Sequence, residues 1–478
     1  MTAQPPTPDH VRDAIIAIVG AGHVLTDASD MAPFITDWRE RYHGAARMVV
    51  RPGSAAEVSQ VVRLCFEHAI PIVPQGGNTS LCGGATPDAS GQAIVLRLDR
   101  MNRIREISAI DAMMLVEAGC VLQTMQEAAA ENGFLFPLSL GAEGSCQIGG
   151  NISTNAGGTA VLRYGTTREL VLGLEVVLAD GTLCDWLTPL RKNNAGYDLK
   201  QLFIGAEGSL GIITAATVKL FAMPAQTATA MVTLADPDAA LALLLRLRAT
   251  LGERLSSFEI INRAQAEIAI THVPGNSLPF TNASPWYVLI EVTDALASHD
   301  LRQALEGVLG TALEDGVITD AVLASSTAQA ASLWRLRHSV SDANKRAGFG
   351  VSHDTAVPLS AQAAFVRGIE ARIGAAFPRA RLLMVGHMGD GNIHVVVMLD
   401  RADYPPPKLA EATSRINALV DAVTLELHGT ISAEHGIGQT NKQRLLDGRS
   451  GRDVALMRAL KATLDPKSLL NPGKLFDL

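Results

Sequence analysis

The sequence predicts an α+β protein with two unlike halves. Between residue 48 and about residue 224, short strand-like runs alternate with helical segments and glycine-rich loops. After Pro224, alanine- and leucine-rich helical segments alternate with longer strand-like runs, which is typical of a sheet covered by helices. The chain has 478 residues, of which 47% are hydrophobic, so it is long enough to bury more than one core.

Residues 1–46 are expected to form a helical lead-in. Within it, the run IIAIVGAGHVL enters Gly20-x-Gly22, which is similar to the start of a dinucleotide-binding fingerprint. Leu25 occupies the third glycine position and no strand–helix–strand unit follows, so we expect no nicotinamide site here.

The first organised unit begins at residue 48. A strand at 48–51 precedes Ser54-x-x-Glu57, a capping-box pattern that predicts a helix to about residue 69. A second strand at 70–73 runs into a glycine-rich loop. Further strands are expected at 93–98, 112–118, 171–178 and 210–220, with a helix at 122–132.

The second half predicts an antiparallel sheet with helices on one face. Helices are expected at 238–251, 299–313 and 328–347, strands at 286–292, 382–385 and 393–399, and a loop at 403–408. The last fifty residues contain glycine-rich turns and a helix that ends before a proline.

Charge and composition exclude several classes of function. The net charge is −8 and no basic run occurs, so a nucleic-acid partner is not expected. No apolar stretch is long enough to span a bilayer, and residues 1–10 lack the pattern of a secretory leader. The five cysteines form no C-x-x-C pair, which indicates free thiols in a cytoplasmic enzyme.

Two long glycine-rich segments predict a ligand site. They are PQGGNTSLCGGATP at 74–87 and GAEGSCQIGGNISTNAGG at 141–158, and a shorter one spans 205–211. Glycine lets the backbone approach a ligand closely, and successive N–H groups form an anion nest. Hydroxyl and amide side chains, among them Asn78, Thr79 and Ser80, are expected to add neutral donors for a pyrophosphate. The alternative is that these loops are only tight turns between strands.

Histidines and a glutamate suggest a metal site. His387 and His394 flank Asp390-Gly391, a hairpin-turn dipeptide, so both rings can face one point. Glu434 and His435 stand between small residues far along the chain. Two imidazoles and a carboxylate suit zinc, manganese or iron and leave open positions for a substrate. The alternative is two polar residues framing a turn, with Glu434 in an ordinary ion pair.

These motifs resemble the D-2-hydroxyglutarate and D-lactate dehydrogenase family, flavoproteins of the vanillyl-alcohol oxidase class. Besides the glycine-rich loops, the similar segments are LRKNNAGYDLKQLFIGAEGSLGII at 190–213, GHMGDGNIH at 386–394, SAEHGIG at 432–438 and the LDP-x-x-x-LNP-x-K ending. The resemblance implies an FAD-binding domain of two subdomains at 47–224, a substrate and cap domain at 225–430, and a segment at 431–478 that returns to the flavin, with Asn471 near the isoalloxazine ring. It implies FAD contacts from Pro74, Gln75, Gly76, Gly77, Asn78, Thr79, Ser80, Gly141, Ser145, Gly149, Asn151, Thr154, Ala156, Gly158, Glu207, Ile212, Ile213 and Asn471.

The resemblance also implies the reaction. A divalent metal, zinc before manganese or iron, would be held by His387, His394 and Glu434, and would lower the pKa of the substrate's 2-hydroxyl. His435 would take the hydroxyl proton while the C2 hydride passes to flavin N5, since imidazole exchanges protons near neutral pH. Arg337 and Ser341, four residues apart on one predicted helix, would anchor the carboxylate, with Asn392 and Ser352 as further substrate contacts.

The chain departs from the hydroxyglutarate-specific pattern at two positions. Ser352 stands where those relatives have lysine, and Val396 where they have asparagine. The loss of two polar contacts weakens discrimination for a dicarboxylate, so D-lactate or a more apolar D-2-hydroxy acid competes with D-2-hydroxyglutarate as the expected substrate.

The leading hypothesis is an FAD- and metal-dependent D-2-hydroxy acid dehydrogenase. The resemblance implies an electron-transfer flavoprotein or a quinone as acceptor, non-covalent FAD and a homodimer. The alternatives are an oxygen-using hydroxy-acid oxidase, a metal hydrolase with purely structural glycine loops, and a catalytically silent flavin-binding module.

Overall fold

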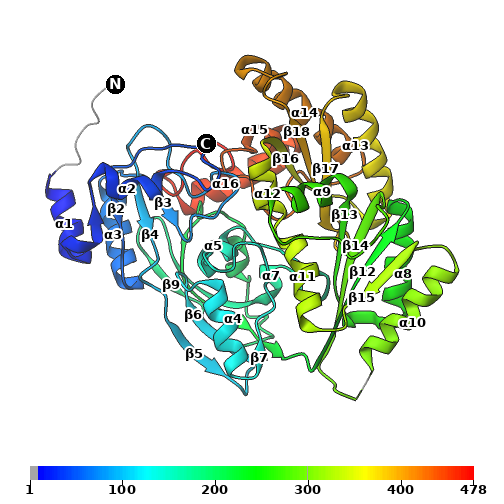
Figure 1. Ribbon diagram of the computed structural model, residues 1–478. Helices are drawn as coiled ribbons and strands as arrows, with labels where there is room; N and C mark the ends of the chain where they lie inside the picture. The colour runs from blue at the N-terminus through cyan, green and yellow to red at the C-terminus, as the bar shows by residue number, and fades with distance from the viewer. Residues whose placement is uncertain (1–8, 299, 478) are drawn as a thin grey trace.

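The computed structural model describes residues 9–298 and 300–477, and its α+β architecture confirms the predicted fold class. Figure 1 shows two halves, with blue and cyan elements on one side and green to orange elements on the other. The red C-terminal helices return to the first half. The absence of a leader, expected for residues 1–10, and the helix start expected at His299 lie mostly outside the described residues.

The lead-in is not purely helical. Helix α1 (Asp9–Val19) is followed by a 3-10 turn, η1 (Ala21–His23), so the Gly20-x-Gly22 pair follows a helix and not the strand that a dinucleotide fingerprint requires. Strand β1 (Val24–Leu25) then joins the first sheet, and helix α2 (Ala28–Ile35) leads to a loop at residues 36–47.

The first sheet has the order β1-β2-β4-β3. Strands β2 (Val49–Val50) and β3 (Ile72–Gln75) both pair in parallel with β4 (Ile94–Arg97), and α3 (Ala55–Glu67) connects β2 to β3. The predicted capping box is present in modified form. Oγ of Ser54 accepts from the backbone N–H of Glu57, whose carboxylate accepts from the N–H of Gly53.

The second sheet is antiparallel and has the order β5-β6-β10-β8-β9. Its strands are β5 (Ile104–Ser108), β6 (Met113–Glu117), β10 (Ile212–Lys219), β8 (Val171–Val177) and β9 (Leu183–Asp185). Around it lie α4 (Leu122–Glu131), α5 (Ile148–Ser153), α6 (Val161–Tyr164), α7 (Thr167–Leu170), η2 (Leu199–Leu202) and the short pair β7 (Phe134–Leu135) and β11 (Phe221–Ala222). One apolar core is shared by both sheets and α1.

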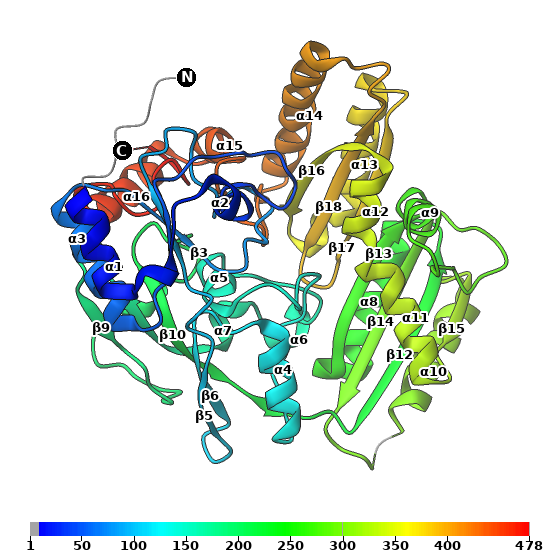
Figure 2. The same ribbon diagram turned by 60° about the vertical axis from the view of Figure 1, so that its left-hand side comes forward.

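A seven-stranded antiparallel sheet dominates the second half, in the order β15-β12-β14-β13-β17-β18-β16. These strands are β12 (Gln226–Leu234), β13 (Leu255–Asn262), β14 (Trp286–Asp294), β15 (Asp320–Leu323), β16 (Phe349–Ala356), β17 (Arg381–His387) and β18 (Asn392–Leu399). Figure 2 shows this sheet standing beside the first half, where α6 contacts β13.

The expectation of helices on one face was wrong, because both faces of this sheet carry helices. One core contains residues of α8 (Pro237–Leu251), α10 (Leu301–Glu314), α13 (Gln362–Ala376) and α14 (Pro406–Glu426). A second core, on the alternate strand positions, contains residues of α9 (Arg263–His272), α11 (Thr327–His338) and α12 (Val340–Ala347). Because both faces are buried, strands such as β14 and β18 are nearly continuous hydrophobic runs and not alternating ones.

Two local predictions also need correction. The helix expected over 328–347 is broken at Ser339 into α11 and α12, and α14 begins at Pro406 inside the expected loop at 403–408. Two more 3-10 turns, η3 (Gly252–Arg254) and η4 (Leu359–Ala361), complete the second half. No helix within 9–298 and 300–477 has the length and hydropathy needed to cross a bilayer.

The C-terminal segment returns to the first half. Helices α15 (Lys442–Gly448) and α16 (Gly451–Leu464) precede a chain that bridges β3 at Ile72. The buried Nζ of Lys461 donates to the carbonyl oxygens of Ser209 and Leu470 and pairs with Asp465. This network brings Asn471 to the glycine-rich loops.

Candidate active site

A cavity of about 730 Å³ extends from the glycine-rich loops to the histidine cluster. It is lined by residues of both halves and of the C-terminal segment. All the residues for which the sequence predicts FAD contacts line it, namely Pro74, Gln75, Gly76, Gly77, Asn78, Thr79, Ser80, Gly141, Ser145, Gly149, Asn151, Thr154, Ala156, Gly158, Glu207, Ile212, Ile213 and Asn471.

Close backbone approach explains two of the glycines. A Cβ on Gly77 would overlap the carbonyl oxygen of Ser145, and a Cβ on Gly158 would overlap that of Ser139. Gly158 also has φ of +137°, a conformation that side chains disfavour. The two long loops are therefore packed against each other through backbone atoms, and they form one wall of the cavity.

Several polar side chains hold the loops and do not face a ligand. The amide of Asn78 donates to the carbonyl oxygens of Pro33 and Thr36, and that of Gln75 donates to Phe34 and Ala85. The hydroxyl of Thr154 donates to Gly150. The expectation that Asn78 supplies a ligand donor through its side chain is therefore wrong.

The hydroxyl of Ser80 is better placed to serve a ligand. Its oxygen accepts from the backbone N–H groups of Cys82 and Gly84, so its own O–H proton is left to donate. Four non-glycine cavity residues, Glu40, Asn78, Glu207 and Asn471, have φ between 45° and 57°. Strained backbone of this kind concentrates at binding sites.

Buried polar atoms without a protein partner support the fit of a polar cofactor. They include Oε1 of Gln147, Oδ1 of Asn151 and Oδ1 of Asn471, and all three residues line the cavity. A buried polar atom costs free energy unless it is hydrogen-bonded. The glycine-lined walls and these acceptors therefore suit a large polar ligand such as FAD.

Glu207 joins the third glycine-rich turn to the segment that carries the catalytic candidates. Its carboxylate accepts from the backbone N–H groups of Ile437 at 2.7 Å and Gly438 at 2.8 Å. Burial raises the pKa of Glu207, although both N–H groups oppose the shift. This contact fixes the turn that presents Glu434 and His435.

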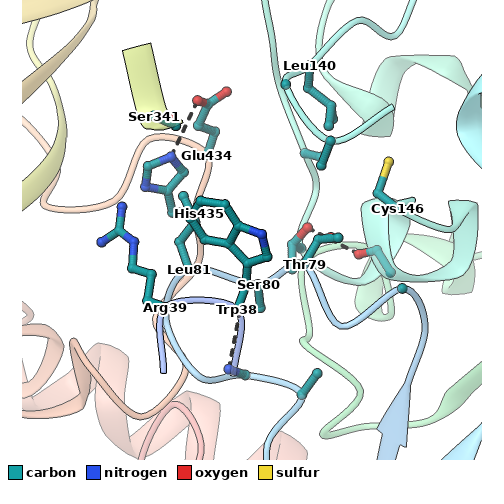
Figure 3. A pocket seen from close by; sticks show the side chains of 18 of the residues that line it. Trp38, Arg39, Thr79, Ser80, Leu81, Leu140, Cys146, Ser341, Glu434 and His435 are labelled. Carbon is teal, nitrogen blue, oxygen red and sulfur yellow. Dashed lines mark hydrogen bonds and ion pairs between the residues drawn. The ribbon is translucent and has the colours of Figure 1, made fainter. Parts of the chain in front are cut away.

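The histidine cluster converges on one oxygen atom. Oε1 of Glu434 lies 3.7 Å from Nε2 of His387, 3.4 Å from Nε2 of His394 and 3.7 Å from Nε2 of His435. His394 comes from β18 and His387 ends β17, which confirms the predicted hairpin around Asp390. Figure 3 shows Glu434 and His435 together at one side of the cavity.

Two buried carboxylates stand behind the histidines, and neither was recognised from the sequence. Oε1 of Glu259, on β13, lies 2.7 Å from Nδ1 of His387. Asp354, on β16, lies 3.6 Å from Nδ1 of His394, and its Oδ2 accepts from the backbone N–H groups of Glu434 and His435. Nδ1 of His387 is therefore hydrogen-bonded to a carboxylate, Nδ1 of His394 has a carboxylate nearby without a hydrogen bond, and both rings turn Nε2 toward Glu434.

The cluster's charges also suit a cation. Burial lowers the pKa of His387, but Glu259 and Glu434 outweigh it and raise that pKa to about 10. Burial raises the pKa of Glu434, but the three surrounding histidines hold it well below its usual range. The pocket therefore retains a proton between two carboxylates, and a divalent metal would supply the same compensating charge.

The chemistry of the donors decides which residues fit a metal. The ligand atoms of Asp354, His394, Glu434 and His435 lie within 4.8 Å of one another. Asp354, however, already accepts from two backbone N–H groups and from Nδ2 of Asn392. Histidine ligands backed by a carboxylate on the other ring nitrogen are the usual arrangement in metal sites, so His387, His394 and Glu434 fit a metal better than a set containing Asp354.

Most of the expected substrate residues border the same space. Arg337, Ser341 and Ser352 all line the cavity, although the break at Ser339 separates the first two. Nε of Arg337 lies 2.7 Å from Oε2 of Glu259, and Nη2 lies 3.5 Å from Nε2 of His387. Arg337 is only 9% exposed, so it is not a solvated surface arginine.

Asn392 is not placed as the sequence predicted. It is buried at the start of β18 and does not line the cavity. Its amide nitrogen donates to Oδ1 of Asp354 and to the carbonyl oxygen of Thr355. Asn392 therefore supports Asp354 and does not contact a substrate in the cavity.

The loop at residues 36–42 was missed as part of the site. Trp38, Arg39 and Arg41 line the cavity, and Nη2 of Arg41 donates to the carbonyl oxygen of Gly350 on β16. The only signal in the sequence was a tryptophan followed by two arginines, in a segment assigned to the lead-in.

Comparisons with known proteins agree with this architecture. Residues 46–186 match the FAD binding domain family, and residues 223–475 match the family of FAD linked oxidases, C-terminal domain. The chain resembles solved structures of p-cresol methylhydroxylase (TM-score 0.75, 17% identity, 98% of this chain and 97% of that one) and of 4-ethylphenol oxidase from Gulosibacter chungangensis (TM-score 0.73, 19% identity, 98% and 97%). At this identity they show the fold alone.

Curated relatives are much more similar. The chain is 40% identical to D-2-hydroxyglutarate dehydrogenase, mitochondrial, of Bos taurus over 97% of its own length and 82% of that protein. It is 38% identical to D-2-hydroxyglutarate dehydrogenase of Xanthomonas citri pv. viticola over 96% and 95%. It is also 34% identical to a putative mitochondrial D-lactate dehydrogenase of Schizosaccharomyces pombe over 94% and 85%. The chain thus belongs to the FAD-linked oxidase family, in the D-2-hydroxyglutarate and D-lactate dehydrogenase group, and is an FAD-dependent dehydrogenase.

Proposed function

We propose that the protein oxidises a D-2-hydroxy acid to the 2-oxo acid, using FAD and a divalent metal. The observation that carries the proposal is the approach of three imidazole Nε2 atoms to Oε1 of Glu434, 3.4–3.7 Å away, in the cavity that the glycine-rich loops line. Arg337, an anchor for a carboxylate, borders the same cluster. Relatives named D-2-hydroxyglutarate dehydrogenase support the substrate class.

FAD, the metal and the protein's own side chains have different roles in this reaction. FAD held by the glycine-rich loops would supply a hydride acceptor, and a divalent metal held by His387, His394 and Glu434 would lower the pKa of the substrate's 2-hydroxyl. The guanidinium of Arg337, held by Glu259 on its Nε side, orients the C1 carboxylate. The reaction then needs one group to take the hydroxyl proton.

His435 fits the role of general base. Its ring stacks on His394 with centroids 5.2 Å apart and planes 10° apart, and its side chain keeps 25% of its surface exposed. Its backbone N–H is fixed by Asp354 at 2.7 Å. The ring is therefore held beside the cluster yet reachable from the cavity, so the proton can pass to Nε2 and later to solvent.

Zinc, manganese and iron all suit two imidazoles and a carboxylate. We propose zinc first, as the metal that most often takes this ligand set with an open position. We also propose an electron-transfer protein or a quinone as the acceptor, and the cytoplasm as the location; all five cysteines are free in the structure, which suits a reducing compartment.

The test is turnover with a substrate panel. Purified protein with bound FAD is mixed with the D- and L-forms of 2-hydroxyglutarate, lactate and 2-hydroxyvalerate, first anaerobically and then with a dye acceptor and with oxygen. We expect bleaching of the flavin by D-forms only, and dye reduction without stoichiometric peroxide. Bleaching by none of the acids would contradict the proposal, and one peroxide per turnover would assign an oxidase.

A further inference from the structure

Ser352 and Val396, where the chain departs from its hydroxyglutarate-specific relatives, are neighbours in the structure. They are paired across strands β16 and β18. Val396 is 6% exposed, Ser352 is partly exposed, and both line the cavity. Gly350 lies two residues before Ser352 on the same face of β16. Because it has no side chain, it adds no polar group to this part of the cavity. At these three positions the wall offers a substrate a hydroxyl and apolar surface, and neither a cation nor an amide side chain.

The loop at residues 36–42 covers this wall from the other half. Arg41 donates to the carbonyl oxygen of Gly350 at 3.0 Å, so the loop is tied to β16 two residues from Ser352. The carboxylate of Asp37 shapes the loop by accepting from the backbone N–H groups of Arg39, Arg41 and Tyr42. The carboxylate of Asp37 is thus already hydrogen-bonded to backbone N–H groups of its own loop.

Within the loop at residues 36–42, Arg39 is the arginine whose guanidinium has no hydrogen-bond or ion-pair partner in the described part of the chain. Among the residues that the structure describes, no carboxylate forms an ion pair with its guanidinium and no acceptor takes a hydrogen bond from it. The nearby acid Glu40 faces Lys345 at 3.5 Å. Burial, with the adjacent Arg41, lowers the pKa of Arg39 to about 10, and the charges of Cys82 and Asp37 oppose the shift only in part.

The guanidinium faces the reacting end of the cavity. Figure 3 shows the Arg39 side chain rising from its loop toward the ring of His435, beside Leu81. Arg39 and His435 both line the cavity, and Arg39 is close enough to the buried thiol of Cys82 to influence its pKa. A desolvated guanidinium without an acceptor is an anion site, and a carboxylate matches its planar fork.

We infer that Arg39 binds the distal carboxylate of the substrate, so that the enzyme selects a D-2-hydroxy dicarboxylate although lysine and asparagine are absent at 352 and 396. This inference rests on the proposed function and narrows it. Arg337 holds the C1 carboxylate next to the metal ligands, and Arg39 holds the second carboxylate from the loop at residues 36–42. A monocarboxylate of the same chain length leaves the half-buried Arg39 unpaired, which disfavours its binding.

The test compares two substrates that differ in one carboxylate. D-2-hydroxyglutarate and D-2-hydroxyvalerate are assayed with wild-type protein, R39M and R39K, all containing FAD. We expect R39M to lower kcat/KM for D-2-hydroxyglutarate by roughly 100-fold, mainly through KM, and to change that for D-2-hydroxyvalerate less than threefold. R39K, which keeps the charge, should recover part of the loss. R346M is the control, because Arg346 is paired with Asp342 on α12 and does not line the cavity.

Two results would overturn the inference. One is an equal loss of both activities in R39M, which would mean that Arg39 positions the flavin or the loop. The other is a wild-type preference for D-2-hydroxyvalerate, which would mean that the cavity accepts an apolar tail.

A binding measurement separates this inference from the proposed function. Calorimetric titration of the FAD-containing protein with 2-oxoglutarate and with 2-oxovalerate needs no turnover. If no 2-hydroxy acid is oxidised, the proposed reaction fails, but tight 2-oxoglutarate binding that R39M abolishes would still support the anion site. Two outcomes would refute the anion site at Arg39. One is that the wild type binds both oxo acids equally well, and the other is that wild type and R39M bind 2-oxoglutarate equally well.

Discussion

Oε1 of Glu259 lies 2.7 Å from Nδ1 of His387, and both side chains are buried. The other oxygen of the same carboxylate lies 2.7 Å from Nε of Arg337. One buried carboxylate on β13 therefore fixes both a proposed metal ligand and the proposed substrate anchor. This places the metal chemistry and carboxylate recognition in one rigid unit.

Replacement of Glu259 by glutamine should weaken metal binding. The amide keeps the size of the side chain but removes the charge that orients His387 and supports its basicity. We expect metal affinity to fall about 10- to 100-fold, measured by elemental analysis after dialysis against a graded chelator. E291Q is the control, since Glu291 is a buried carboxylate that contacts Trp334 and Thr229 instead. Full retention of metal in E259Q would contradict this account.

Replacement of His435 by glutamine should slow flavin reduction without emptying the site. We expect the rate of reduction by the D-2-hydroxy acid to fall by about 10²- to 10⁴-fold, because the hydroxyl proton loses its acceptor. FAD and metal contents should stay at wild-type levels. H272Q, on α9, controls for the loss of an imidazole elsewhere. An unchanged reduction rate would remove His435 from the mechanism.

Replacement of Gly77 by alanine should release the flavin. The added Cβ overlaps the carbonyl oxygen of Ser145, so the two glycine-rich loops have to separate. We expect the purified variant to have lost most of the absorbance of oxidised flavin at roughly 450 nm. Gly22 has open space around its Cβ position, so G22A should remain yellow. A yellow G77A protein would show that this contact does not shape the FAD site.

His353 should contribute to acid lability. Burial, with the charge of Arg444, lowers its pKa from 6.5 to about 4, while Nε2 lies 2.9 Å from Oδ1 of Asn417. The unfolded chain binds a proton at this position below pH 6.5 and the folded chain does not, so stability is full above pH 6.5 and falls toward pH 4.

The variant H353Q tests that contribution. Glutamine can donate to Asn417 but does not titrate, so we expect the wild type to lose about 2 kcal/mol more than H353Q in free energy of unfolding between pH 7.5 and roughly pH 5. Urea unfolding at the two pH values measures the difference. Equal losses in the two proteins would show that His353 is not the group responsible.

The sequence predicted the site through its long motifs. Glycine-rich loops and the His-x₆-His hairpin can be predicted from the sequence. The close approach of a glycine backbone to a ligand, and the turn between the two histidines, both depend on residues that are close together in the chain. Glu207 was predicted only in part. Its motif was recognised, but its role in fixing Ile437 and Gly438 depends on a contact across 230 residues.

What the sequence did not predict depends on tertiary contacts. Glu259 and Asp354 look like ordinary polar positions in strands, and only the order of the seven-stranded sheet places them behind His387 and His394. Arg39 lies in a short loop with no motif, and its importance appears only where that loop meets β16. The helices on both faces were missed because β12 and β13 were not recognised as strands.

The most direct test of the account is anaerobic reduction of the bound flavin by D-2-hydroxyglutarate in protein stripped of metal. Protein shown by elemental analysis to be metal-free, yet still yellow, is mixed with substrate before and after addition of zinc or manganese. We predict that the flavin stays oxidised without metal and bleaches once metal is restored. Bleaching at the same rate in metal-free protein would contradict the metal site at His387, His394 and Glu434.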